Sequence, residues 1–162
     1  MRKIHPLPLT AQSFERYGQV LFLDGRESEG VVVSKSDDLN DARTYAPIID
    51  TVGSLGYTIA RTLPTQITAM ERHFDTEEGA FGAGLPFVLV VDDAEGEHPD
   101  PATVAAFIVP VGTVVKLNRG IWHDACLGLS EPTPYYWFAY CANNFLDEWA
   151  ELPEPVELAL EG

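Results

Sequence analysis

The sequence has few basic residues and no long apolar runs, the features expected of proteins that bind nucleic acid or membranes. It carries only 10 Lys and Arg against 25 Asp and Glu, for a formal net charge of −15, and such a surface repels phosphate backbones and anionic lipid. No apolar run approaches the roughly 20 residues of a membrane span, and no apolar signal core follows the basic residues Arg2 and Lys3. We therefore expect a cytoplasmic protein with no nucleic-acid or membrane partner.

Cysteine is equally scarce. The two cysteines, Cys126 and Cys141, have no second Cys at the spacing of a zinc finger, and a chain of 162 residues does not need a disulfide. We expect both thiols to be buried and reduced. The sequence also lacks internal repeats, heptads and a Gly-rich phosphate loop. Because 46% of its residues are apolar, the chain can bury the core of one domain, which we assign to residues 1–162.

Short apolar segments separated by Gly and Pro turns are the most frequent pattern. They recur from Pro47 onward, and the aromatic run Tyr135, Tyr136, Trp137, Phe138 and Tyr140 has the composition of a strand. Many short strands with such turns predict an all-β sandwich or barrel, here over residues 57–142. We expect the aromatic run to contribute to the core and to a dimer interface.

Three flanking segments have patterns of their own. Residues 10–18 predict a short helix that Thr10 caps and Gly18 ends. Residues 26–50 are polar and weakly periodic, which predicts a long loop or flap. Residues 143–152 predict a closing helix.

Two of the four histidines lie where the residues of a barrel mouth are found, at the end of a predicted strand or just after one. Glu71 and His73 are two residues apart on one strand and therefore share a face. Glu78 can return to this face after a short turn, and His123 follows a glycine turn. Two imidazoles with one or two carboxylates can bind divalent Ni, Mn, Fe or Zn.

Each of these residues also has a purely structural interpretation. His73 and His123 could be hydrogen-bonded histidines packed in the barrel. Glu78 could belong to a solvated acidic run, and Glu71 could pair with a neighbouring arginine.

The second histidine segment contains further candidates for substrate binding. Arg119 could bind a substrate carboxylate through two parallel hydrogen bonds, or it could pair with surface acids, and Lys116 has the same two possibilities. We expect Trp122 to shape the pocket and assign it, with Asn118, to the substrate-binding residues. Asp124 could orient an imidazole or face water.

Several segments occur in the order found in the ureidoglycolate lyase family of the cupin superfamily, which the chain resembles from about Pro6 to His123. The resemblance rests on the segments Pro6 to Thr10, Phe14 to Gly18, Met70 to His73, Ala80-Phe81, Phe87 to Val91, Pro99-Asp100, Ala106 to Ile108 and Arg119 to His123. It implies a double-stranded β-helix, or jelly-roll barrel, with short N- and C-terminal helices. It also implies a lyase that splits ureidoglycolate into glyoxylate and urea in allantoin and purine catabolism.

The resemblance further implies a homodimer and a divalent metal, nickel in the family. Carried over to this chain, His73, His123 and Glu78 would hold the metal, which would chelate the carboxylate and hydroxyl of a small anionic substrate. Glu78 or Glu71 would remove the hydroxyl proton, and Arg119 would balance the carboxylate charge.

Three positions depart from the family pattern and keep two other functions open. The family usually has Gln where this chain has Glu78, or where it has Gly79 if one residue is inserted. Asn118 and Asp124 stand where the family usually has His. The first alternative is a cupin enzyme that acts on another small hydroxy, keto or sugar acid. The second is a cupin that binds a small acid without catalysis.

Overall fold

Strands dominate the computed structural model, which describes residues 1–141 and 148–161. The single helix of the described residues is α1 (Ala11–Phe14). The strands are β1 (Arg2–Ile4), β2 (Leu7–Pro8), β3 (Gly18–Phe22), β4 (Val31–Lys35), β5 (Asn40–Thr44), β6 (Ser54–Ile59), β7 (Thr65–Arg72), β8 (Glu78–Gly82), β9 (Phe87–Asp92), β10 (Ala105–Val109), β11 (Thr113–Leu117), β12 (Trp122–His123), β13 (Leu127–Gly128), β14 (Pro134–Ala139) and β15 (Glu148–Leu158).

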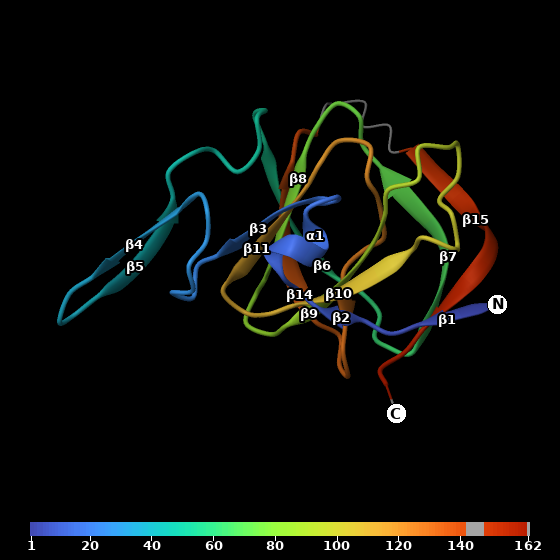
Figure 1. Cartoon of the computed structure of the whole chain (residues 1–162), viewed down its shortest axis with the longest axis horizontal. Helices are drawn as coiled ribbons and strands as arrows, with labels where there is room; N and C mark the ends of the chain where they lie inside the picture. The colour runs from blue at the N-terminus through green and yellow to red at the C-terminus, as the bar shows by residue number, and fades with distance from the viewer. Residues whose placement is uncertain (142–147, 162) are drawn as a thin grey trace.

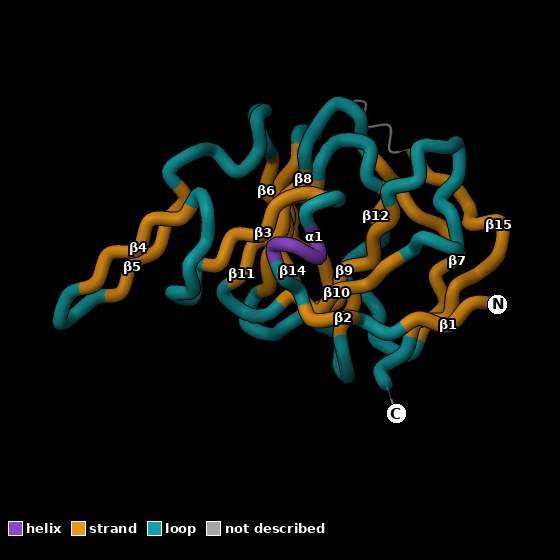
Figure 2. Tube along the Cα trace, in the orientation of Figure 1, coloured by secondary structure: helices purple, strands orange, loops and turns teal. Residues whose placement is uncertain are grey.

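Two sheets form the barrel. The larger has the strand order β1-β15-β7-β12-β9-β10-β2, with β13 beside β9, and the smaller has the order β3-β11-β8-β14-β6. Figures 1 and 2 show these strands wrapped around a common interior, with the short α1 on the outside. The structure therefore confirms the predicted all-β barrel. Among the described residues, no helix is long and apolar enough to cross a membrane.

Strand β9 lies at the centre of the packing because both of its faces are buried. Phe87, Leu89 and Val91 join the apolar cluster between the two sheets, whereas Val88 and Val90 join a second cluster on the opposite face. Side chains alternate across a strand, so a strand with a continuous apolar run is covered on both sides. This explains why β9 consists almost entirely of large apolar residues.

The N-terminal helix is shorter than the predicted segment 10–18. Thr10 caps it as expected, in a reciprocal pair with Ser13, but Gly18 begins β3 and does not end the helix. On β3, Gly18 pairs with Leu117, and a Cβ atom at this position would lie 1.7 Å from the carbonyl oxygen of Lys116. The glycine is therefore required for the close approach of two strands, a demand that the local sequence does not reveal.

The segment 26–50, predicted as a long loop or flap, contains the hairpin of β4 and β5. The hairpin extends away from the barrel (Figure 1), and it reverses at a turn in which the amide of Ser36 donates to the carbonyl of Leu39 at 2.8 Å. The run Val31 to Val33 is the sequence signal for this strand, since β-branched residues favour extended backbone.

The predicted closing helix over residues 143–152 is wrong where the structure can test it. Residues 143–147 lie outside the described residues, and residues 148–152 belong to β15, which pairs along β7. The register shifts between Glu151 and Val156, where Pro153 and Pro155 cannot donate backbone hydrogen bonds. The barrel therefore also extends beyond the predicted range 57–142, with strands from both ends of the chain.

We expect Trp122→Ala to destabilise the barrel strongly. The Trp122 side chain is fully buried, donates a hydrogen bond to the carbonyl of Ala94 at 3.1 Å, and carries the Arg72 guanidinium 4.0 Å above its ring. Its loss should lower the free energy of unfolding by about 3–5 kcal/mol. Chemical denaturation measures this, with Trp149→Ala as the control because Trp149 is 53% exposed. Equal losses in the two variants would contradict the argument.

Candidate metal centre and cleft

Four side chains converge between the two sheets, and we refer to Glu71, His73, Glu78 and His123 as the His–Glu cluster. Glu71 lies on β7 and His73 follows that strand, so the two point inward together. His123 on β12 lies directly opposite Glu71 in the antiparallel ladder. Glu78 begins β8 and reaches the cluster from the smaller sheet. The sequence prediction that the two distant histidines meet beside an acid is confirmed.

The distances within the His–Glu cluster are those of directly interacting groups. The Oε2 atom of Glu78 lies 3.1 Å from Nε2 of His73 and 3.4 Å from Nε2 of His123. Nε2 of His123 is also 4.0 Å from Oε1 of Glu71. The two imidazole centroids are 5.1 Å apart. One carboxylate oxygen therefore lies between two imidazole nitrogens.

The cluster fits a divalent metal ion. Glu71, His73 and His123 offer ligand atoms that all lie within 4.8 Å of one another. The Nδ1 atom of His123 is 3.0 Å from the carbonyl oxygen of Ile121, and donation to this oxygen places the lone pair of the neutral ring on Nε2. That Nε2 atom is buried and, although Oε2 of Glu78 lies 3.4 Å away, it forms no well-directed hydrogen bond with any described residue, so its lone pair can ligate a metal.

The charges around His123 favour its protonated form. Burial alone would lower the pKa of His123, but the charges of Glu78 and Glu71 outweigh it and raise the pKa from 6.5 to about 9. Burial alone would likewise raise the pKa of Glu78, but the two histidines outweigh it and lower the pKa from 4.5 to about 2. A protonated His123 therefore faces an ionised Glu78 at neutral pH.

The directions of these two pKa shifts define the pH range in which the His123–Glu78 pair stabilises the fold. A raised histidine pKa stabilises the fold fully below 6.5, and this contribution disappears as the pH rises through about 9. A lowered carboxyl pKa stabilises the fold above 4.5, and this contribution disappears as the pH falls through about 2. The metal-free protein should thus gain most from the pair between these two ordinary pKa values.

We expect metal uptake to release close to one proton at about pH 7.5, because only a neutral imidazole can ligate a metal. The release should decline as the pH passes the His123 pKa of about 9. Calorimetric titration with a divalent ion in buffers of different ionisation enthalpy measures the proton count. Uptake without proton release at about pH 7.5 would contradict protonation of His123 in the metal-free state.

A cleft of about 220 Å³ opens onto the His–Glu cluster. Glu71, His73 and Glu78 line one part of it, and the rest is formed by side chains from β6, β14, β15 and the segment after β12. These further lining residues are Thr58, Ala125, Tyr135, Trp137 and Trp149. The cleft is large enough for a small organic acid, and the cluster lies at its wall.

Lys116 and Arg119 are not among the residues that line this cleft. On β11 the neighbours Val115 and Leu117 point into the core, so Lys116 points to the outer face, where its Nζ donates to Glu77 at 3.0 Å. Arg119 makes two hydrogen bonds to Asp50, at 2.7 and 2.8 Å.

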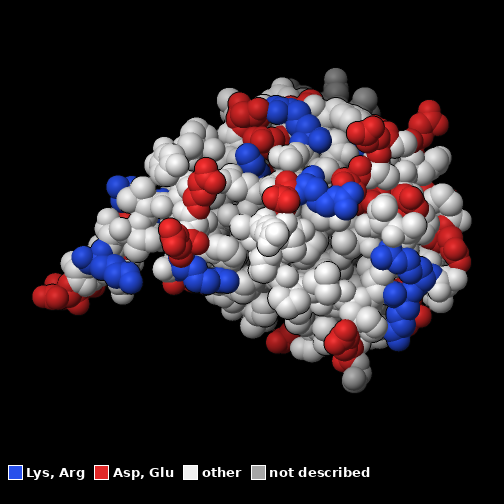
Figure 3. Space-filling view, in the orientation of Figure 1, with Lys and Arg blue, Asp and Glu red and all other residues white. Residues whose placement is uncertain are grey.

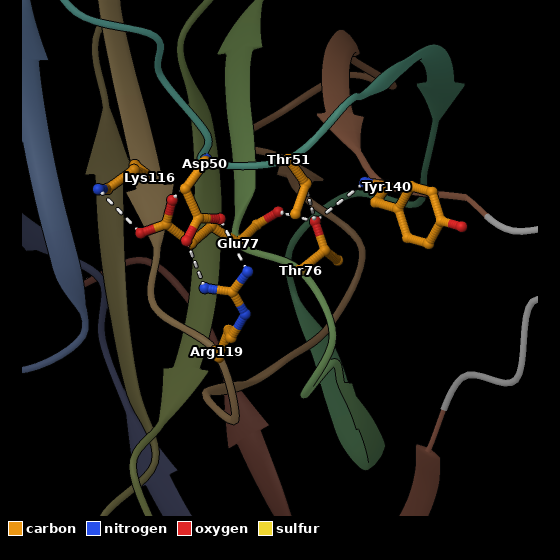
Figure 4. A network of polar contacts seen from close by, with 7 residues as sticks. All are labelled: Asp50, Thr51, Thr76, Glu77, Lys116, Arg119 and Tyr140. Atoms are coloured by element: carbon orange, nitrogen blue, oxygen red, sulfur yellow. Dashed lines mark hydrogen bonds and ion pairs between the residues drawn. The ribbon is translucent and has the colours of Figure 1, made fainter.

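Figure 4 shows that both cations belong to one surface network. In it the amide of Asp50 donates to Glu77 at 3.1 Å, and the amide of Tyr140 donates to Thr76 at 2.9 Å. The predicted substrate-binding role of Lys116 and Arg119 is therefore not supported by their positions, because their charges are already compensated outside the cleft.

The other candidates also lie outside the cleft. Trp122 belongs to the buried core, which corrects its assignment as a substrate-binding residue. Asn118 lies in an exposed turn, where its amide donates to the carbonyl of Tyr17 at 2.9 Å. Asp124 forms an ion pair with Arg61 at 2.7 Å, so it neither orients an imidazole nor faces water alone.

The wall that β6 and β14 contribute to the cleft was not predicted from the sequence. The aromatic run was expected in the core and in a dimer interface. Tyr135 does lie in the core, with Trp137 packed against it, but both side chains also alternate with the outward-facing Tyr136 and Phe138 and line the cleft. Because side chains alternate in direction along a strand, the sequence alone could have placed Tyr135 and Trp137 on one face of residues 134–139. Thr58 had no comparable signal, because its position depends on how β6 pairs with β14.

Charged residues on the outer surface do not form a basic patch on the face in Figure 3. Lys and Arg side chains there lie next to Asp and Glu side chains. Arg16, for example, forms an ion pair with Asp93.

Comparisons with known proteins point to one family. The sequence profile of the family described as "Ureidoglycolate lyase" matches residues 1–157. The chain is 28% identical over 141 residues to a ureidoglycolate lyase of Mesorhizobium japonicum, covering 83% of this chain and 84% of that protein. It is 27% identical over 137 residues to one of Pseudomonas syringae, covering 81% and 79%. A solved TDP-fucose-3,4-ketoisomerase from Campylobacter jejuni has a TM-score of 0.48 at 9% identity, covering 78% and 83%.

Proposed function

Because the chain belongs to the ureidoglycolate lyase family, we propose that it cleaves ureidoglycolate into glyoxylate and urea with the help of a divalent metal ion. The observation that carries this proposal is the convergence of His73 and His123 with two carboxylates at the wall of a cleft. This arrangement supports metal-assisted chemistry on a small hydroxy acid.

We assign separate roles to the two carboxylates. His73, His123 and Glu78 would hold the ion, because one Glu78 oxygen lies 3.1 Å from Nε2 of His73 and 3.4 Å from Nε2 of His123, and its lowered pKa keeps it ionised. Glu71 would act as the base, since it lines the cleft and lies farther from His123, at 4.0 Å. A base must lie within hydrogen-bond reach of the proton that it removes.

The reaction then needs a single proton to move. A bound divalent ion would supply Lewis acidity at the hydroxyl and carboxylate oxygens of the substrate. Glu71 accepts the hydroxyl proton, the carbonyl of glyoxylate forms, and the C–N bond breaks with its electron pair on nitrogen. The proton from Glu71 then passes to this nitrogen, so urea leaves and the carboxylate is restored.

The decisive experiment supplies ureidoglycolate to the purified protein and measures both products. Urea and glyoxylate should appear in equal amounts, EDTA should stop the release, and adding back Ni, Mn, Fe or Zn ions separately should identify the active metal. A metal-replete protein that releases neither product would overturn the proposal. Faster turnover of another small hydroxy, keto or sugar acid would favour the alternative cupin enzyme.

We also infer that the working form is a cytoplasmic homodimer. The edge strand β6 presents Leu55, Tyr57 and Ile59, which are 68%, 55% and 58% exposed, next to Tyr136 on β14. An apolar patch on a sheet edge that no other described strand covers supports a second copy of the chain as the partner. Light scattering should show a dimer, and Tyr57→Asp should yield monomers; a monomeric wild-type protein would contradict this inference.

A further inference from the structure

The cleft contains no Lys or Arg among the described residues that line it. The polar groups of a substrate that do not reach the His–Glu cluster must therefore be bound by neutral donors. Thr58 on β6 and Tyr135 on β14 carry two such donors, and they lie opposite each other in the antiparallel ladder. They form part of the wall contributed by the smaller sheet.

Thr58 is held in a defined orientation. The Nε1 atom of Trp137 donates a hydrogen bond to Oγ1 of Thr58 at 3.1 Å. The Trp137 ring passes over Gly56, where a Cβ atom would lie 1.9 Å from the indole. Because Thr58 accepts from the indole, its own hydroxyl proton can point to another acceptor, either the neighbouring Tyr135 hydroxyl or a bound substrate.

Tyr135 is the larger of the two donors. It is 5% exposed, lines the cleft and packs against Phe87 with ring centroids 5.8 Å apart. Burial raises the pKa of Tyr135 above its ordinary value, so the hydroxyl stays protonated. A protonated phenol next to anionic carboxylates suits a neutral acceptor, such as an amide or urea carbonyl oxygen.

We propose that Tyr135 and Thr58 bind the ureido carbonyl oxygen of the substrate and form the subsite of the leaving urea. This inference rests on the proposed function and adds the residues that recognise the leaving group. It also orients the substrate, since the carboxylate and hydroxyl then face the His–Glu cluster.

The subsite would contribute to the rate as well as to binding. When the C–N bond breaks, its electron pair moves onto a nitrogen that is conjugated with the ureido carbonyl, so negative charge develops on the carbonyl oxygen. Donors preorganised around this oxygen stabilise the transition state more than the ground state. The proton taken by Glu71 returns to the nitrogen, and no further reactant is consumed.

The test compares Tyr135→Phe with Tyr136→Phe, its neighbour on the outer face of β14, which stacks on Phe81. Tyr135→Phe should lower kcat by about 100-fold without changing the metal content. It should weaken inhibition by urea by about tenfold and leave inhibition by glyoxylate unchanged. Tyr136→Phe should behave as the wild-type protein in all four measurements.

A second pair of variants, at Thr58, keeps the test valid even if the Tyr135→Phe variant does not fold. Thr58→Val should lower kcat by about tenfold, and Thr58→Ser should restore it because the hydroxyl returns. Unchanged kcat in both Tyr135→Phe and Thr58→Val, or equal loss of urea and glyoxylate inhibition, would overturn this inference alone. Wild-type protein that releases no urea from ureidoglycolate would overturn the proposed function and the inference together.

Discussion

Replacing His123 by Ala is expected to abolish metal retention and to lower turnover of ureidoglycolate by at least about 10³-fold. His123 supplies the buried Nε2 atom that forms no well-directed hydrogen bond with any described residue. Its position is fixed, because β12 is held between β7 and β9. Elemental analysis of the purified variant measures the metal, and product assays measure the turnover.

His98→Ala is the matched control for this result. His98 is exposed, and its Nδ1 atom lies 3.2 Å from the carbonyl oxygen of Glu151, away from the cleft. This variant should keep both its metal and its turnover. Normal metal content in His123→Ala would show that the ion binds elsewhere in the protein. The metal-assisted mechanism at the His–Glu cluster would then be wrong.

Glu71→Gln is expected to have the second-largest effect and to separate chemistry from metal binding. Gln has nearly the same size but cannot accept the hydroxyl proton at neutral pH, so kcat should fall by about 10²–10⁴-fold. His73, Glu78 and His123 remain in place, so the metal content should stay near that of the wild-type protein. Product release in single-turnover experiments, combined with elemental analysis, gives both quantities.

The control for Glu71→Gln is Glu77→Gln, a neighbouring acid in the surface network with Lys116. This variant should keep its turnover, because the network does not touch the cleft. Loss of the metal in Glu71→Gln would mean that Glu71 is a ligand, as its place within 4.8 Å of both imidazoles allows. In that case the assignment of Glu71 as the base would fall, and Glu78 would take its place.

The local sequence predicted the central part of the barrel, but it predicted neither the β4–β5 hairpin nor the C-terminal strand β15. Apolar segments and turn residues were sufficient for a barrel over residues 57–142, because most of its strands have one or two buried faces. The strands β8, β12 and β13 within this range were not predicted. The hairpin of β4 and β5 was missed because its residues are mostly exposed and show no apolar period. The helix predicted over 143–152 failed because residues 148–152 pair with β7, and propensity does not detect a distant partner.

The candidate site was predictable where spacing along one strand decides the geometry. Glu71 and His73 share a face for this reason, and the pairing of His123 with Glu71 completes the arrangement. Lys116 was misplaced because the alternation along β11, read from Val115 and Leu117, was not applied to it. Arg119 was misplaced because its acceptor, Asp50, comes from a segment whose course the sequence does not reveal.

The burial of β9 on both faces determines how the protein unfolds. The strand belongs at once to the packing between the sheets and to the packing behind it, so neither half can open while the other stays closed. Heating or denaturant should therefore remove metal affinity and secondary structure in one transition, and the backbone amides of β9 should be the last to exchange with deuterium.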